Sequence, residues 1–179
     1  PADHIDGNLK VIIVPGLLYR EYPGSGADGR MLIEAARQLG WDYEVISTAS
    51  TGRLVENAEV LLRYLENNSD RPLVLASISK GGSEIAAAMQ LDPLGQRFAS
   101  VVGWVDVCGI IFGSPVIDFI ARQRLRMLGF RALFAVRRWS FASVLDMRYD
   151  GMLAAGFEAP DHINIVHAVG FPAEEDFTL

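Results

Sequence analysis

The sequence predicts an α/β protein: a three-layer α/β sandwich in which helices cover both faces of a mostly parallel sheet. Five short runs rich in apolar residues predict strands at 10–14, 43–48, 73–78, 100–107 and 164–169. Most are apolar without strict alternation, which is typical of strands that are buried on both faces, and helical segments separate the early ones. The length of 179 residues suits a single domain, which we expect to span 1–179.

The expected helices follow from apolar residues spaced three and four positions apart. The first is expected over 28–39, with Asp28 as its N-cap and Gly40 as its stop. A second is expected over 54–67, and a third over 83–91, soon after the strand at 73–78. This alternation of strand and helix favours parallel pairing.

The stretch between the fourth and fifth strands interrupts the alternation. We expect a helical cap insertion at about 117–158, with Gly129 dividing its main segment into two helices. No acidic residue lies between Asp118 and Asp146. Six arginines lie between these two aspartates: Arg122, Arg124, Arg126, Arg131, Arg137 and Arg138. The favoured interpretation is a pair of amphipathic helices with solvated arginines, and the alternative is a lid whose cationic, apolar surface meets lipid or an anionic acyl substrate.

Composition excludes several classes of protein. The net charge of −6 argues against a domain-wide basic surface for nucleic acid, and no apolar run approaches the roughly 18 residues needed to span a bilayer. Cys108 is the single cysteine, so we expect a buried small side chain there, no disulfide framework and a cytoplasmic location. The composition leaves the oligomeric state open.

No cofactor or metal ion is expected. The histidines have no ligand spacing, which argues against a metal site. The stretch 24–29 has the pattern G-x-G-x-x-G, but it does not directly follow the strand that ends at Val14. A dinucleotide site needs that adjacency and an acid after the next strand, so we interpret the stretch as a turn.

The sharpest chemical signal is Ser77-Ile78-Ser79-Lys80-Gly81, where a predicted strand meets a predicted helix. This is the setting of a nucleophile elbow of the G-x-S-x-G type, with Ser77 in place of the first glycine. The elbow requires small residues on both sides of a strained serine, and Ser77 and Gly81 meet that requirement. We therefore expect Ser79 to be a nucleophile and the Lys80 N–H to be an oxyanion donor. An ordinary strand-to-helix turn capped by a serine is the alternative.

A second oxyanion donor is expected after the first strand. In Val14-Pro15-Gly16-Leu17-Leu18, the Leu17 N–H follows a glycine at the end of a strand. With this loop and the elbow, the chain resembles the α/β-hydrolase superfamily over most of 8–115 and again at 163–170. The stretch Gly113-Ser114-Pro115-Val116-Ile117-Asp118-Phe119 is also similar to one that follows the equivalent strand in lipases of that superfamily.

The resemblance implies esterase or lipase chemistry, with the triad in the chain order serine, acid, histidine. Asp176, after the fifth strand, is the candidate acid, and Asp106 is a weaker one. His162 precedes the fifth strand and His167 lies within it, where a structural role is favoured. We therefore expect the base, and one further strand, to lie in a segment that follows Leu179.

The function expected from these residues is a serine hydrolase that cleaves a carboxylic ester or thioester through an acyl-enzyme on Ser79. The expected partner is a small acyl-ester or lipid-like substrate; nucleic acid is excluded, and a membrane surface is the less favoured partner. Two alternatives stay open. One is a non-catalytic binding or scaffold protein of the same fold, and the other is an acyltransferase.

Overall fold

The computed structural model describes residues 8–151 and 156–170, which form a five-stranded sheet flanked by helices. All described strand pairs are parallel, and the strand order is β2-β1-β3-β4-β5. The strands are β1 (Lys10–Val14), β2 (Asp42–Val45), β3 (Leu73–Ile78), β4 (Val101–Val107) and β5 (Asn164–Ala168). The predicted α/β fold with a parallel sheet is therefore confirmed.

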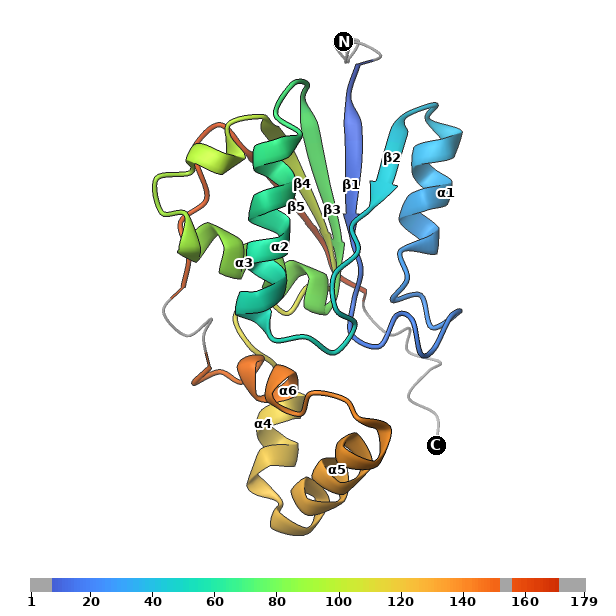
Figure 1. The fold of residues 1–179 in the computed structure, drawn as a ribbon, viewed down its shortest axis with the longest axis vertical. Helices are drawn as coiled ribbons and strands as arrows, with labels where there is room; N and C mark the ends of the chain where they lie inside the picture. The colour runs from blue at the N-terminus through green and yellow to red at the C-terminus, as the bar shows by residue number, and fades with distance from the viewer. Residues whose placement is uncertain (1–7, 152–155, 171–179) are drawn as a thin grey trace.

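Helices cover the two faces of the sheet unequally. On one face lies α1 (Arg30–Gln38), and on the other lie α2 (Leu54–Asn67) and α3 (Lys80–Leu91) (Figure 1). A short 3-10 helix, η1 (Gln96–Phe98), leads into β4. Alternation along β1 explains the two cores, because Ile12 and Val14 pack with α2 and α3 while Val11 and Ile13 pack with α1.

The carboxyl ends of the parallel strands meet at one edge of the sheet. Val14 is paired with Ser77 in β3, and Val107 is paired with both Ile78 and Ala168. Turns that follow β1, β3, β4 and β5 therefore converge, and ligands of open α/β sheets bind at this edge. We call it the carboxyl edge.

Three helices between β4 and β5 lie beyond the carboxyl edge (Figure 1). These cap helices are α4 (Pro115–Arg122), α5 (Arg124–Arg137) and α6 (Ala142–Asp146). Asp146 joins them to the sheet domain, because its carboxylate accepts hydrogen bonds from the Arg53 guanidinium (2.8 Å) and the Leu54 N–H (3.2 Å). Within the described residues, no helix has the length and apolar character needed to cross a membrane.

Three details of the helices differ from the sequence predictions. Gly129 lies inside α5, and the break falls at Gln123, whose backbone is extended. One glycine costs a helix only about 1 kcal/mol, which neighbouring turns can offset. The N-cap of α1 is Gly29 rather than Asp28, although the Asp28 carboxylate accepts a hydrogen bond from the Arg30 N–H. Helix α3 begins at Lys80, three residues before the predicted start.

Candidate active site

Ser79 stands alone between β3 and α3 in a conformation that side chains rarely adopt. Its φ is 51° and its ψ is −116°. Three backbone hydrogen bonds hold it there: its N–H donates to Val107 O, and its carbonyl accepts from the N–H groups of Gly82 and Ile110. Such strain costs on the order of 1–3 kcal/mol and persists where the surroundings over-determine the backbone. The serine side chain is thereby presented at the carboxyl edge.

The turn closes because glycines allow the backbone segments to approach one another. A Cβ atom at Gly81 would lie 2.2 Å from the Val14 carbonyl oxygen, closer than any real contact. A Cβ atom at Gly16 would lie 3.5 Å from Ser79 Cβ. The first turn of α3 therefore packs directly on the end of β1, and the loop after β1 runs alongside Ser79. The sequence expectation that Gly81 is a steric requirement agrees with this contact.

Two backbone N–H donors near Ser79 lack an acceptor in the part of the chain that the structure describes. Lys80 is the first residue of α3, so its N–H has no acceptor within the helix. Leu17 follows Gly16, whose own N–H donates to Ala27 O at 2.8 Å. Among the described residues, neither the Lys80 N–H nor the Leu17 N–H has a hydrogen-bond acceptor. The start of α3 adds the positive end of its dipole, so the site favours a negative charge beside Ser79.

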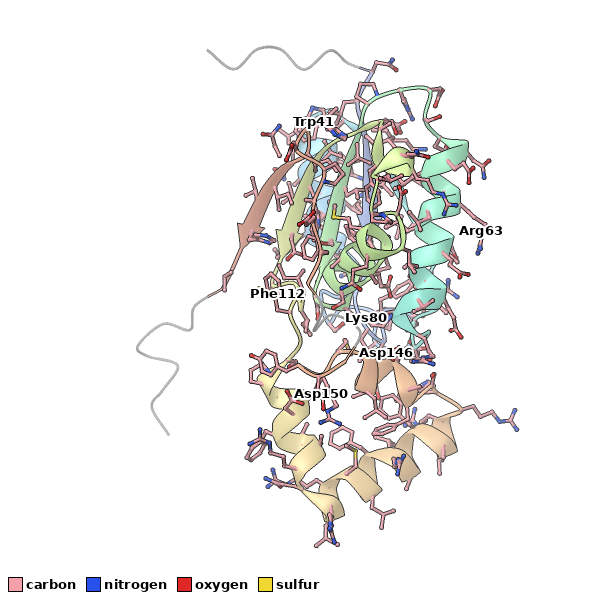
Figure 2. All side chains as sticks on the ribbon, turned by 90° about the vertical axis from the view of Figure 1, so that its left-hand side faces the viewer. Trp41, Arg63, Lys80, Phe112, Asp146 and Asp150 are labelled. Carbon is pink, nitrogen blue, oxygen red and sulfur yellow. The ribbon has the colours of Figure 1, made fainter. Side chains whose placement is uncertain are left out.

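The Lys80 side chain points into the protein rather than into the site. Lys80 and Glu84, one turn apart on α3, form an ion pair in which both side chains are only 1% exposed. The Glu84 carboxylate also accepts a hydrogen bond from Asn57 Nδ2 at 2.6 Å, and the Asn57 side chain is tied in both directions to the backbone of Ala49. Figure 2 shows Lys80 near the junction between the sheet and the cap helices.

Burial dominates the electrostatics of this ion pair. It raises the pKa of the Glu84 carboxyl above its usual 4.5, while Lys80, Asn57 and Thr48 act in the opposite direction. Through the hydrogen bonds of Asn57, the ion pair joins the start of α3 to α2 and to the loop after β2. Neither Glu84 nor Asn57 was predicted from the sequence as part of the site. The i, i+4 spacing of Lys80 and Glu84 was the available signal, but it does not distinguish a buried pair from an exposed one.

A second buried network lies beneath the elbow. The Ser77 hydroxyl donates to Asp106 Oδ1 at 2.5 Å and accepts from Trp104 Nε1 at 2.8 Å. Asp106 Oδ2 is 3.2 Å from Nδ1 of His167, whose ring makes an edge contact with Trp104. Ser77 was chosen from the sequence only for its small size. The structure gives it a second role, as the link between β3 and the Asp106 carboxylate.

The histidines of the described residues differ in position. His167 lies within β5, as expected, and is paired with Asp106 on the neighbouring strand β4. His162 precedes β5, and its Nε2 lies 3.1 Å from Phe98 O, before β4, at the opposite edge of the sheet. Neither histidine hydrogen-bonds to Ser79 in the described part of the chain. Asp176, the candidate acid, lies outside the described residues.

Cys108 corrects another expectation. It follows β4 directly with a φ of 50°, and its side chain is exposed rather than buried. The last residue of the strand is Val107, so Cys108 has already left the covered part of the sheet. No group of three or more histidine, cysteine or acidic side chains able to hold a metal ion occurs among the described residues.

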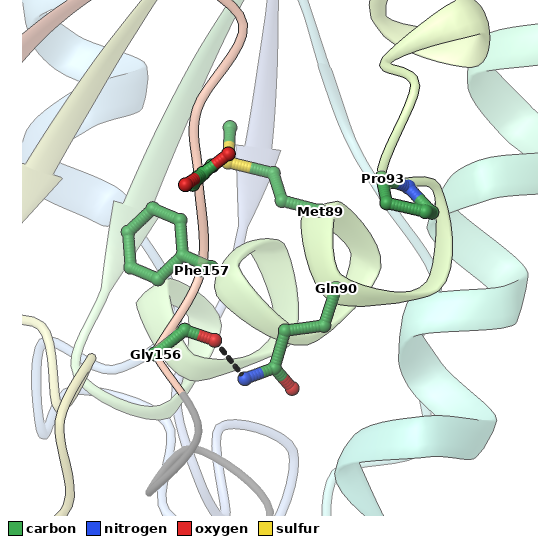
Figure 3. Close-up of a pocket in the computed structure, with 6 residues that line it drawn as sticks. Met89, Gln90, Pro93, Gly156 and Phe157 are labelled. Atoms are coloured by element: carbon green, nitrogen blue, oxygen red, sulfur yellow. Dashed lines mark hydrogen bonds between the residues drawn. The ribbon is translucent and has the colours of Figure 1, made fainter.

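An open hollow of about 640 Å³ lies at the other end of α3. Met89, Gln90 and Pro93 line it from the helix side, and Gly156, Phe157 and Glu158 line it from the segment that leads to β5 (Figure 3). Ser79 caps the start of α3, and Met89 lies ten residues later, which corresponds to roughly 15 Å along a helix. The hollow is therefore separate from the elbow.

Comparisons with known proteins show the fold of the chain. No protein-family model and no curated protein matches its sequence. Among solved structures, a metagenomic carboxyl esterase aligns with 98% of this chain and 54% of its own length, at a TM-score of 0.66 and 20% identity. The mature lipase BlEst2 of Bacillus licheniformis aligns with 87% of this chain and 61% of its own length, at a TM-score of 0.60 and 18% identity.

A third solved structure gives the fold its name. Mouse alpha/beta hydrolase domain-containing protein 10 aligns with 88% of this chain at a TM-score of 0.53 and 12% identity, and the alignment covers 68% of that protein. The chain therefore has the α/β-hydrolase fold. It spans between half and two thirds of the length of the esterase and the lipase that it resembles.

Proposed function

We propose that this protein is a serine hydrolase that cleaves a carboxylic ester or thioester through an acyl-enzyme on Ser79. The observation that carries the proposal is the strained backbone of Ser79 at the carboxyl edge, next to two N–H groups that have no acceptor among the described residues. Backbone strain at a residue other than glycine is typical of functional sites. The fold that the chain shares with esterases and lipases supports the same chemistry.

In the proposed reaction, Ser79 Oγ attacks the carbonyl carbon while a histidine removes its proton. The N–H groups of Leu17 and Lys80 stabilise the oxyanion, a contribution of about 3–4 kcal/mol per donor in comparable sites. The histidine then protonates the leaving alcohol or thiol, and an acyl-enzyme remains. Attack by water, with the same histidine as base, releases the acid and restores Ser79.

The base and the acid of the proposed triad are assigned as the sequence predicts. Asp176 is retained as the candidate acid, and a histidine after the fifth strand is retained as the expected base. Within the described residues, His167 is the alternative base, because Asp106 holds its Nδ1 as the acid of a triad does. We further propose one domain over 1–179 with a cap insertion at about 117–158, a cytoplasmic location and a small acyl-ester or lipid-like substrate.

The nucleophile is tested by labelling the full-length protein with a fluorophosphonate and measuring its turnover of a water-soluble activated ester. Ser79→Ala is expected to abolish labelling and to lower kcat by roughly four orders of magnitude or more. Ser69→Ala, which changes an exposed loop serine, is the matched control, and we expect it to leave both the labelling and kcat unchanged. Full turnover in Ser79→Ala would exclude the mechanism. Failure of the unchanged, folded full-length protein to label would favour a binding or scaffold protein.

The base is tested separately with His167→Ala and His162→Ala. If the base lies after the fifth strand, both variants keep their labelling by the fluorophosphonate and most of their turnover. If His167→Ala loses both labelling and turnover while His162→Ala keeps them, the base is assigned to His167. Transfer of the acyl group to an added alcohol in preference to water would identify an acyltransferase.

A further inference from the structure

Helix α5 carries an apolar stripe on its outer surface. Leu125, Leu128 and Val136 are 86%, 66% and 80% exposed. With the exposed Ala132 they are spaced three and four residues apart, so they share one face of the helix. Large apolar side chains gathered in this way on a surface mark an interaction site more often than isolated ones do.

The opposite face of α5 already packs inside the cap. Phe134 is buried, and its ring makes edge contacts with Trp139 and Phe141 at 5.5 Å. Met127 and Phe130 line a small apolar cavity shared with α4 and α6. The outer stripe is therefore a second apolar face, and folding of the cap does not explain it.

Arginines lie on both sides of the outer stripe. At about 100° per residue, Arg126 and Arg137 fall on one side of the Leu125–Val136 line, and Arg124 and Arg131 fall on the other. Three of these side chains lie over aromatic rings of the cap: Arg126 over Phe119, Arg131 over Phe141 and Arg137 over Trp139. Their charges therefore stay close to the helix.

The structure describes no acidic partner for the six arginines. None of them forms an ion pair among the described residues, and no acid lies between Asp118 and Asp146. The segment contributes six positive charges to a chain whose net charge is −6. An anionic partner is favoured for this surface. A second copy of α5 is not, because its arginines would face like charges.

We propose that α5 docks in the plane of an anionic lipid bilayer, with Leu125, Leu128 and Val136 in the acyl boundary and the flanking arginines among the lipid headgroups. An apolar stripe bordered by basic residues is the pattern of helices that lie in the membrane interface, and anionic headgroups supply the missing counter-charges. The surface is independent of the chemistry at Ser79. Because α5 lies beyond the carboxyl edge, docking turns that edge toward the bilayer, and delivery of a lipid ester there rests on the proposed function (Figure 1).

Sedimentation of the full protein with vesicles tests the docking. We expect it to bind vesicles of phosphatidylcholine with phosphatidylglycerol, to leave pure phosphatidylcholine vesicles largely unbound, and to bind less at high salt. Leu125→Ser with Leu128→Ser, and separately Arg124→Gln with Arg126→Gln, are each expected to weaken binding about tenfold or more. The matched apolar control is Met31→Ser with Leu94→Ser, two comparably exposed residues outside the cap, and we expect it to bind normally.

The outcomes separate this inference from the proposed function. Equal binding to neutral and anionic vesicles, or unchanged binding in both cap variants, would overturn it. So would a dimer in solution, measured by light scattering, that the Leu125 and Leu128 substitutions convert to monomer. Turnover of a water-soluble ester reports on Ser79 alone, and it is expected to persist in every folded cap variant. Loss of that turnover in Ser79→Ala, with vesicle binding retained, would support both proposals.

Discussion

The turn around Ser79 and the outer face of α5 place basic side chains and glycines in opposite environments. At the turn, a lysine is buried in an ion pair, and a glycine lies against a backbone carbonyl. On α5, arginines have no acidic partner among the described residues, and a Cβ atom added at Gly129 would meet open space. The basic side chain at the turn is paired within the fold, whereas the arginines on α5 remain available to a partner. Matched substitutions in the two kinds of environment measure this difference.

The largest effect is expected from breaking the buried ion pair. Lys80→Met leaves the Glu84 carboxylate without its cation, which typically costs about 3–5 kcal/mol of unfolding free energy. Adding Glu84→Gln removes the uncompensated charge and keeps an acceptor for Asn57, so the double variant is expected to recover much of the loss. Urea unfolding of the single and double variants measures the coupling.

An exposed ion pair with the same spacing provides the control. Glu59 and Arg63 are also four residues apart on a helix, but both side chains are exposed. Glu59→Gln is therefore expected to change stability by less than about 0.5 kcal/mol. Equal effects of the buried and exposed single substitutions would contradict the view that burial makes the Lys80 pair important.

Gly81→Ala is expected to be the next most damaging change. The added Cβ would meet the Val14 carbonyl oxygen at 2.2 Å, and backbone atoms at the end of β1 cannot move aside cheaply. We expect a loss of about 3 kcal/mol together with loss of ester turnover, because the elbow would shift. Thermal melting and turnover measured on one preparation test both effects, and a variant with unaltered melting would show that the turn is looser than described.

Ser77→Ala is expected to cost less, about 1–3 kcal/mol. The side chain keeps its small size, but Asp106 Oδ1 and Trp104 Nε1 lose their hydroxyl partner inside the protein. Ser77→Leu adds bulk to the same loss and is expected to be worse and to reduce turnover. Denaturant unfolding ranks the two variants. If Ser77→Ala proves neutral, size alone explains the serine and the hydrogen bonds contribute little.

Gly129→Ala should have the smallest effect and the opposite sign. The position is an open helical site with no neighbour within 4 Å of the added Cβ, and alanine is a better helix former than glycine. A gain of about 0.5–1 kcal/mol is expected, provided that unfolding of the cap is part of the transition that is followed. Comparing the unfolding free energies of Gly129→Ala and Gly81→Ala tests how strongly the same substitution depends on the region in which it is made. A loss here would mean that α5 packs against something outside the described contacts.

The sequence by itself determined the order of the elements and the position of Ser79 between a strand and a helix. These features depend on local signals: apolar runs, helical spacing and small residues that flank one serine. The same signals gave wrong predictions at two positions where tertiary packing determines the outcome. Gly129 does not break α5, and Cys108 is exposed because it lies just beyond the part of the sheet that is covered.

Tertiary structure alone decided which polar residues meet. Strand register brings Asp106 beside both Ser77 and His167, residues far apart in the sequence. Helix packing buries Lys80 with Glu84 and Asn57, and folding of the cap leaves Leu125 and Leu128 on the outside. Spacing along the chain predicts that a residue lies on a helix face or in a strand. Which face becomes buried depends on long-range packing, because the free energy of burial belongs to the assembled layers and not to any one segment.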